Sequence, residues 1–358
     1  MASSTFSAFV KISTVIIFLT CFPPNKPPAL AHGNHDTKIS PSPQSPNSFP
    51  IYHITFLKNN DSESFALRRR KSTYTETPLI SKRGAYLVRV RLGSQKLIAH
   101  LLLDTGSRFT WWQCSTCRKC YEQYDVLYNP TRSSSYRTLD CHNPDCNRFA
   151  APNIGCEQEI GSDTGRCTYM TRYADNDTSS GVLAHDIIRN EDGTLFRQVV
   201  FGCGEENQGK YYNGFYSGVL GFGRHPYSFL GQFDVRNFSF CLGGADSQTT
   251  LYLNEIPPMD DDRSTFHTSL ITAWNRPQDY YIEFEGISMD GVKVPIAPHK
   301  WKFNPKSAQY GVFIDTGTII TRFPTEVYNT FRQSFDHSVE NFELLDEPVN
   351  DLLDTCYQ

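Results

Sequence analysis

The stretch Leu101-Leu102-Leu103-Asp104-Thr105-Gly106-Ser107 returns later in the chain as Val312-Phe313-Ile314-Asp315-Thr316-Gly317-Thr318. Each copy consists of three apolar residues, Asp-Thr-Gly and a hydroxyl residue. A single Asp-Thr-Gly is expected by chance only about 0.1 times in a chain of this size and average composition. Two copies in the same setting therefore indicate an internal repeat and a fold with two related halves.

The residue types predict how each copy folds. A continuous aliphatic run is typical of a buried strand, so Asp104 and Asp315 each stand where a strand ends. Glycine permits a turn that a Cβ would obstruct, and neighbouring hydroxyls can hydrogen-bond a carboxylate. Two such loops related by an approximate twofold axis would bring the two carboxylates together. The residues expected to support these loops are Thr105, Gly106, Ser107, Thr316, Gly317 and Thr318.

Paired carboxylates define a reaction type. Two carboxylates in contact cannot both ionise readily, so one is held protonated while the other stays charged. The charged group can take a proton from a bound water, and the neutral group can hydrogen-bond a peptide carbonyl and later donate its proton. This is general acid–base hydrolysis without a covalent intermediate. Because the pair titrates as a unit, the proton is assigned to neither Asp104 nor Asp315.

Composition and charge exclude several classes of protein. The chain has 39% hydrophobic residues, including 25 Phe and 19 Tyr, which can bury a large core and excludes a wholly disordered protein. No apolar run reaches the roughly 18–20 residues that a membrane-spanning helix requires. Residues 84–358 carry 24 Lys and Arg against 34 Asp and Glu, and this acidic body argues against nucleic acid as a partner.

The start of the chain differs from the rest. Residues 1–31 are typical of a secretory signal, with the apolar stretch Ile12–Phe22 and a small-residue cleavage site at Ala29-Leu30-Ala31. Residues 32–84 are a basic leader, interpreted either as a solvated linker or as a propeptide lying on the acidic body. We therefore expect a protein that is secreted or delivered to a vacuole, without membrane attachment once the signal is removed.

Cysteine usage also points to an oxidising compartment. The chain has 11 cysteines, so removal of Cys21 with the signal leaves an even number, which favours disulfides. Cys114-x-x-Cys117-x-x-Cys120 also has a spacing found in metal sites, but the ferredoxin pattern needs a further cysteine where Tyr124 stands. We expect disulfides and no metal or cofactor. Sequons predict glycosylation at Asn176 and Asn237.

Short strand-like runs separated by turn residues predict a mainly antiparallel β protein with few helices. The repeat adds that these strands form two lobes with a cleft between them. The expected strands are residues 86–92, 97–103, 199–202, 280–287 and 312–314, and the expected helix is 328–338, opening after Pro324.

The motifs resemble the pepsin-type aspartic endopeptidases, and more closely the plant nepenthesin-like group. The likeness covers roughly residues 85–358. Besides the two Asp-Thr-Gly copies, it is carried by Thr110-Trp111, Tyr173-Ala174-Asp175-Asn176-Asp177, Gly218-Val219-Leu220-Gly221-Phe222-Gly223-Arg224, Phe238-Ser239-Phe240-Cys241-Leu242 and Leu353-Asp354-Thr355-Cys356-Tyr357.

The resemblance implies roles for individual residues. Asp104 and Asp315 are the catalytic pair, and Tyr173 is a flap tyrosine that closes over substrate and hydrogen-bonds the indole of Trp111. The fold is bilobal and pepsin-like, with a first lobe at 85–242 and a second lobe at 243–358. The implied disulfides are Cys114–Cys117, Cys120–Cys203, Cys141–Cys167 and Cys146–Cys156.

Two departures from the family pattern stand out. The flap is less rich in glycine, although Asn176 tolerates the left-handed conformation that glycine adopts. In the first lobe, Gly218–Gly221 is expected to pack behind the catalytic loop, and the 43 residues after Asp315 contain no second apolar-apolar-Gly segment of this kind. Cys241 and Cys356 also lack their family partners. We therefore expect the second lobe to be incomplete.

The leading hypothesis is a monomeric aspartic-type endopeptidase that cleaves a peptide or protein substrate at acid pH and binds its own propeptide. The alternative is an inactive protease-like scaffold that binds another protein, for example as an inhibitor. The two intact Asp-Thr-Gly copies favour the enzyme, whereas the altered flap and the incomplete second lobe favour the scaffold.

Overall fold

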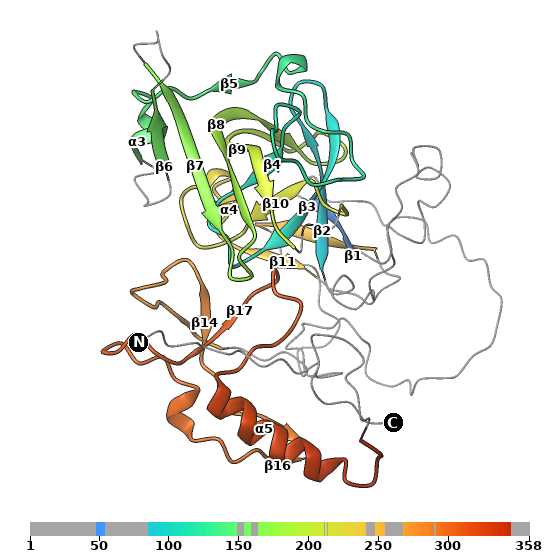
Figure 1. Cartoon of the computed structure of the whole chain (residues 1–358), viewed down its shortest axis with the longest axis vertical. Coiled ribbons are helices and arrows are strands. Elements are labelled where there is room, and N and C mark those ends of the chain that lie inside the picture. The colour runs from blue at the N-terminus through green and yellow to red at the C-terminus, as the bar shows by residue number, and fades with distance from the viewer. Residues whose placement is uncertain are drawn as a thin grey trace, which may run out of the picture.

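The computed structural model describes residues 48–53, 85–148, 154–158, 164–210, 212, 214–240, 248–254, 268–289 and 291–344. The predictions for the signal at 1–31 and for most of the leader lie outside these residues, as do Cys241 and Cys356. In the described part the protein is mainly β and forms an upper and a lower body, as expected for two lobes (Figure 1).

The upper body is the first lobe, and one twelve-stranded sheet runs through its described residues in the order β11-β12-β1-β2-β3-β10-β4-β9-β8-β7-β6, with β5 paired to β8. Because β3 lies between β2 and β10, the first Asp-Thr-Gly loop leaves the interior of the sheet. The strands are β1 (Ser48–His53), β2 (Tyr86–Leu92), β3 (Leu97–Asp104), β4 (Trp111–Gln113), β5 (Arg137–Thr138), β6 (Ile154–Glu157), β7 (Arg166–Arg172), β8 (Thr178–Arg189), β9 (Phe196–Gln208), β10 (Gly218–Gly221), β11 (Phe238–Phe240) and β12 (Gln248–Leu253).

Two strands of this sheet come from outside the range 85–242. β12 pairs with β11 and with β1, both antiparallel, so the first-lobe sheet continues to Leu253 rather than ending at residue 242. β1, from the leader, lies between β12 and β2 and pairs with both. The leader therefore contributes one strand to the sheet that carries the first catalytic loop.

A tight strand pair supports the first catalytic loop from behind. β10 runs parallel to β3 with Gly221 opposite Asp104, and the Phe222 amide donates to the Asp104 carbonyl at 2.7 Å. A Cβ on Gly221 would lie 2.5 Å from the Phe109 carbonyl oxygen, so only glycine permits this approach. The predicted packing of Gly218–Gly221 behind the loop is confirmed.

Aromatic side chains fill the core of the first lobe. Trp112 on β4 stacks on Phe201 of β9 with ring centroids 3.6 Å apart, and Tyr128 meets both rings edge-on. All three side chains are fully buried. Burial of such a side chain contributes roughly 2–3 kcal/mol, so this cluster fixes β4 and β9 beside the catalytic strand.

The lower body is the second lobe, which has a smaller described sheet of order β13-β14-β17. In the described residues β17 pairs with β14 alone, whereas β3 has a partner on each side. The apolar face of α5 packs on Ile287, Trp301 and Phe323. The elements are β13 (Leu270–Ile271), β14 (Tyr280–Ile282), β15 (Ser288–Met289), β16 (Val292–Lys293), β17 (Val312–Ile314) and α5 (Thr325–Ser338), and the short first-lobe helices are α3 (Pro144–Arg148) and α4 (Phe229–Gln232).

Most predicted elements are found, with shifted ends. The strands at 86–92 and 312–314 are confirmed, 97–103 extends by one residue, and 199–202 lies inside the longer β9. The strand predicted at 280–287 ends at Ile282 because its partners β13 and β17 are only two and three residues long. The helix begins at Thr325, directly after Pro324, rather than at Tyr328.

The eight described cysteines of the first lobe form four disulfides, but all four pairings implied by the resemblance are wrong. The Cα atoms of Cys114 and Cys203 lie 5.5 Å apart because β4 and β9 are adjacent parallel strands. The remaining three Cα distances, 5.5–5.9 Å, are also suited to disulfides. The pairs in the structure are Cys114–Cys203, Cys117–Cys120, Cys141–Cys156 and Cys146–Cys167.

Candidate active site

The two Asp-Thr-Gly loops meet between the lobes and are held by reciprocal hydrogen bonds. The Thr316 hydroxyl donates to the Leu103 carbonyl at 2.8 Å and accepts from the Thr105 amide at 3.1 Å. The Thr105 hydroxyl donates to the Ile314 carbonyl at 3.2 Å and accepts from the Thr316 amide at 3.0 Å. Each threonine thus binds the main chain of the other loop, as the twofold relation of the repeat predicts.

Each carboxylate is oriented by its own loop in the same way. Asp104 accepts from the Gly106 amide at 2.8 Å and from the Ser107 hydroxyl at 2.5 Å. Asp315 accepts from the Gly317 amide at 3.0 Å and from the Thr318 hydroxyl at 2.7 Å. The loop therefore fixes both oxygens of each carboxylate.

The glycines show how closely the carboxylates approach. A Cβ added to Gly106 would lie 2.9 Å from Oδ1 of Asp315, and one added to Gly317 would overlap the carboxylate of Asp104. Each carboxylate therefore rests against the glycine of the opposite loop. Any side chain at either glycine would separate the pair.

Burial and mutual repulsion keep this pair from ionising fully. Asp104 is only 6% exposed, and burial, together with the charge of Asp315, raises its pKa to about 7. Hydrogen bonds from Ser107 and Gly106 lower the pKa, but by less. A site with one proton shared over two carboxyl groups follows, and it suits general acid–base chemistry below neutral pH.

Tyr173 and Trp111 meet as the resemblance implies. Trp111 is fully buried on β4, and its indole Nε1 donates to the Tyr173 hydroxyl at 2.6 Å. Burial, and next the nearby charge of Asp104, raise the pKa of the tyrosine, so its hydroxyl stays protonated. The tyrosine thus lies at the site as a neutral hydrogen-bonding group.

The hairpin that carries Tyr173 joins β7 to β8 by a tight turn. The Asn176 amide donates to the Tyr173 carbonyl at 3.0 Å, and Asn176 has φ 70°, the left-handed conformation predicted for it. The Tyr173 amide donates to the Asp177 carbonyl, and the Asp177 carboxylate accepts from the Lys210 amide at 2.9 Å. Asn176 and Asn237 are both exposed, which is compatible with glycosylation.

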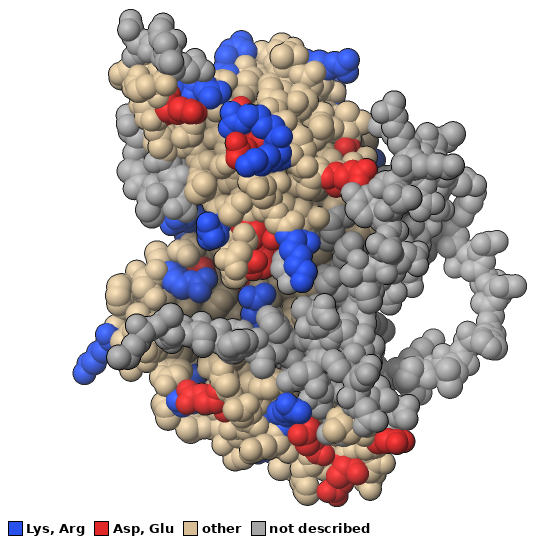
Figure 2. Space-filling model, viewed as in Figure 1, with Lys and Arg blue, Asp and Glu red and all other residues tan. Residues whose placement is uncertain are grey.

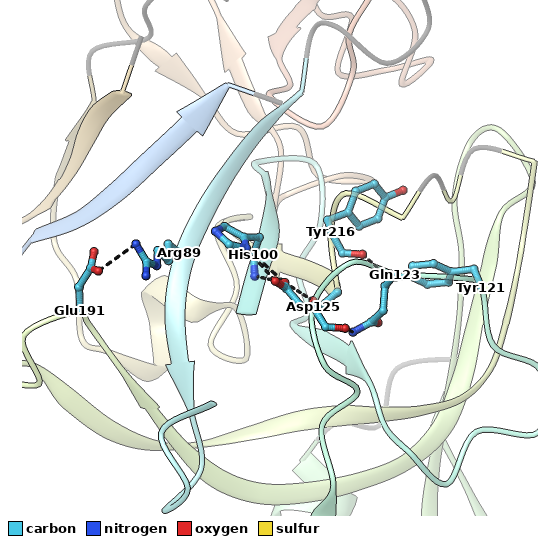
Figure 3. A network of polar contacts seen from close by, with 8 residues as sticks. Arg89, His100, Tyr121, Gln123, Asp125, Glu191 and Tyr216 are labelled. Carbon is cyan, nitrogen blue, oxygen red and sulfur yellow. Dashed lines mark hydrogen bonds and ion pairs between the residues drawn. The ribbon is translucent and has the colours of Figure 1, made fainter. Parts of the chain in front are cut away.

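A buried polar network under the site escaped the sequence interpretation (Figure 3). Asp125 accepts from the His100 amide at 2.7 Å and the Ser217 hydroxyl at 2.6 Å, and the His100 ring lies 3.0 Å away. Burial alone would raise the pKa of Asp125, but the His100 and Ser217 contacts together lower it. Through Gln123, which bonds both Asp125 and Gln113, the network reaches the end of β4.

The network ties the catalytic strand β3, which carries His100, to the loop before β10, which carries Ser217. A signal for it existed in the sequence, because His100 interrupts an otherwise apolar strand four residues before Asp104. Polar side chains inside a buried strand need partners. The partner Asp125 lay in a loop whose path the sequence did not predict.

The surroundings of the site carry charge of both signs. Figure 2 shows Lys and Arg side chains near the junction of the two bodies, with acidic side chains among them. No group of three or more His, Cys, Asp or Glu side chains in the described ranges could hold a metal ion. No helix of that same part is long and apolar enough to cross a membrane.

Comparison with known proteins places this geometry in a family. A profile described as xylanase inhibitor N-terminal matches residues 86–253, and one described as xylanase inhibitor C-terminal matches 279–358. Aspartic proteinase nepenthesin-1 of Nepenthes gracilis is 29% identical over 94% of this chain and 77% of its own length. Aspartic proteinase nepenthesin-2 of the same organism is 31% identical over 81% of this chain and 63% of its own.

A protein of Arabidopsis thaliana, ASPARTIC PROTEASE IN GUARD CELL 2, is 31% identical over 76% of this chain and 56% of its own length. The crystal structure of edgp matches the fold with a TM-score of 0.57 and 17% identity, covering 87% of this chain and 74% of that one. The present chain thus spans between about half and three quarters of the length of these curated relatives.

The fold of two β lobes and the paired loops are those of the pepsin-like aspartic protease family. The chain belongs to that family and, within it, to the plant nepenthesin-like group.

The four hydrogen bonds by which Thr105 and Thr316 join the two loops, called the threonine grip below, lead to a prediction about stability. Thr316→Val keeps the side-chain shape but leaves the Leu103 carbonyl and the Thr105 amide without partners between the lobes. Two such losses cost about 3 kcal/mol. We expect a clearly lowered Tm in thermal unfolding.

The matched control is Thr330→Val on α5, where the exposed hydroxyl donates to the Glu326 carbonyl at 3.1 Å. This change is expected to cost less than about 0.5 kcal/mol. Equal Tm values for the two variants would show that the grip does not hold the lobes together.

Proposed function

We propose that the protein is an aspartic-type endopeptidase that hydrolyses peptide bonds at acid pH. The observation that carries the proposal is the meeting of Asp104 and Asp315, each oriented by its own loop and resting against the glycine of the other. The relatives named aspartic proteinases support the same reaction class.

The proposed mechanism uses the pair as one acid–base unit. A water held between the carboxylates loses a proton to the charged member and attacks the peptide carbonyl carbon. The protonated member donates a hydrogen bond to the carbonyl oxygen, and a proton then passes to the leaving nitrogen. No covalent intermediate forms, and the buried position of Asp104 favours retention of the shared proton.

The substrate is proposed to be an extended peptide or protein segment lying between the lobes under the Tyr173 hairpin. Closure of that hairpin would exclude water from the site. The hydrogen bond from Trp111 to the Tyr173 hydroxyl would limit how far the hairpin moves. We further propose a secreted or vacuolar location, a monomeric state and glycosylation at Asn176 and Asn237, on the sequence grounds given above.

A second candidate function is protein binding without catalysis. It is favoured by the descriptions of the two matching family profiles, which name xylanase inhibitors. In that case the paired aspartates would be retained for their structural hydrogen bonds, and the surface between the lobes would hold another protein without cleaving it.

Single substitutions of the pair separate these candidates. Asp104→Asn or Asp315→Asn removes one member of the acid–base unit, because one carboxylate cannot act as both acid and base. We expect hydrolysis of denatured protein at acid pH to fall by about a thousandfold or more in each variant. The wild-type activity is expected to be blocked by pepstatin, a transition-state mimic of this class.

The control is Asp336→Asn on α5, a partly exposed aspartate 3.8 Å from Arg332, which should retain full activity. Substantial turnover in either dyad variant rejects the assigned pair. Wild-type protein that cleaves nothing yet binds a xylanase would instead support the second candidate.

The leader is proposed to be a propeptide. Residues 32–84 carry eight Lys and Arg against four Asp and Glu, and β1 of the leader pairs with β2 and β12 of the first lobe. Carboxylates of the acidic body protonate as the pH falls, so attraction to the basic leader weakens. We expect the leader to be retained at neutral pH and released at acid pH.

Incubation of the secreted precursor over a range of pH, followed by electrophoresis, tests this. The inactive Asp104→Asn precursor is the control, since it distinguishes release of the strand from cleavage. A leader held equally tightly at acid and neutral pH contradicts the proposal.

A further inference from the structure

A third carboxylate lies beside the catalytic pair, and no motif singled it out. β14 and β17 pair antiparallel with Tyr280 opposite Ile314. This is the last pair of the ladder, and Asp279 and Asp315 are the next residues of the two segments beyond it. Asp279 therefore lies at the same end of the strand pair as Asp315.

Asp279 is buried and has one close counter-ion. Its side chain is 0% exposed, and its Oδ2 lies 2.5 Å from Nε of Arg276, whose side chain is 46% exposed. The Asp279 amide donates to the Arg276 carbonyl at 3.1 Å, so a short turn fixes the pair. The Arg276 guanidinium lies 4.9 Å from the centre of the Phe313 ring, two residues before Asp315.

Hydrogen bonds join the same turn to the first lobe, next to the loop that carries Asp104. The Tyr280 hydroxyl donates to the Phe222 carbonyl at 2.6 Å, and the Phe222 amide in turn donates to the Asp104 carbonyl at 2.7 Å. The Arg224 amide donates to the Gln278 carbonyl at 2.8 Å. The position of Asp279 relative to the pair is therefore fixed from both lobes.

Among the described residues, the charged and titratable groups that interact with Asp279 include Arg276 of its own turn, Asp315 directly after β17 and Tyr281 of β14. Burial raises the pKa of Asp279, Arg276 lowers it, and the charge of Asp315 raises it further.

We infer that Asp279 and Arg276 form a charge pair that sets the pH range in which the catalytic pair holds a single proton. Asp279 is a positioning residue that acts through Asp315, and the inference rests on the proposed peptidase function. A negative charge beside the dyad raises both of its macroscopic pKa values, and a positive charge lowers both. The two members therefore act in opposite directions.

The sign of each substitution follows. Asp279→Asn removes the negative charge and leaves Arg276 uncompensated, so the pH–rate profile should move to lower pH, by about 0.5–1 unit. Arg276→Gln leaves the negative charge uncompensated, so the profile should move to higher pH by a similar amount. The double variant should lie close to the wild type. Because Asp279 is charged only above its raised pKa, the alkaline limb should move more than the acid limb.

The experiment measures kcat/KM for a fluorogenic peptide across pH in the three variants and in the wild type. The charge-matched controls are Asp336→Asn and Arg332→Gln, the exposed pair on α5, which should leave both limbs in place. A structural defect alone would lower kcat/KM at every pH without moving the limbs. If Asp279→Asn fails to fold, the half-exposed Arg276→Gln still tests the inference alone.

A second readout does not need turnover. The carboxyl signals of the catalytic pair, followed by ¹³C NMR over pH, should titrate at lower pH in Asp279→Asn and at higher pH in Arg276→Gln. An inactive wild type with these NMR shifts rejects the proposed peptidase but keeps the charge pair. An active wild type, with variants whose pH–rate limbs and dyad titration match those of the wild type, overturns the inference and keeps the peptidase.

Discussion

The structure depends on one interaction, the reciprocal grip of Thr105 and Thr316 on the main chain of the opposite loop. Each threonine hydroxyl both donates to and accepts from the other lobe, which satisfies polar groups that burial would otherwise leave unpaired. The grip brings two strand ends together, and the carboxylates that follow are placed by their own loops. Apposition of the two carboxylates is thus a consequence of how the lobes are joined.

The two halves of this repeat are not equal. Asp104 leaves a strand with a partner on each side and is buried, whereas Asp315 leaves a strand that pairs only with β14 among the described residues and is partly exposed. Unequal surroundings separate the proton affinities of two chemically identical groups. Both members of the proposed charge pair, Asp279 and Arg276, come from the second lobe.

The repeat of apolar triplet and Asp-Thr-Gly predicted the fold class and the pairing of Asp104 with Asp315, because strand ends and glycine turns are local properties. The Trp111–Tyr173 contact followed from the family resemblance. The disulfide pairs were wrong, because cysteine spacing does not specify which strands become neighbours, as β4 and β9 do for Cys114 and Cys203. Asp125 and Asp279 were missed for the same reason, since each gains its role from a partner distant in sequence.

The central claim is that the two loops hold their carboxylates as one protonated unit. Selective ¹³C labelling of aspartate carboxyls, with Asp104→Asn and Asp315→Asn used to assign the signals, measures this directly. The account predicts two coupled steps, with one proton retained until near pH 7, the value to which burial and repulsion raise the pKa of Asp104. Two independent titrations near the ordinary aspartate value of about 3.9 would contradict it.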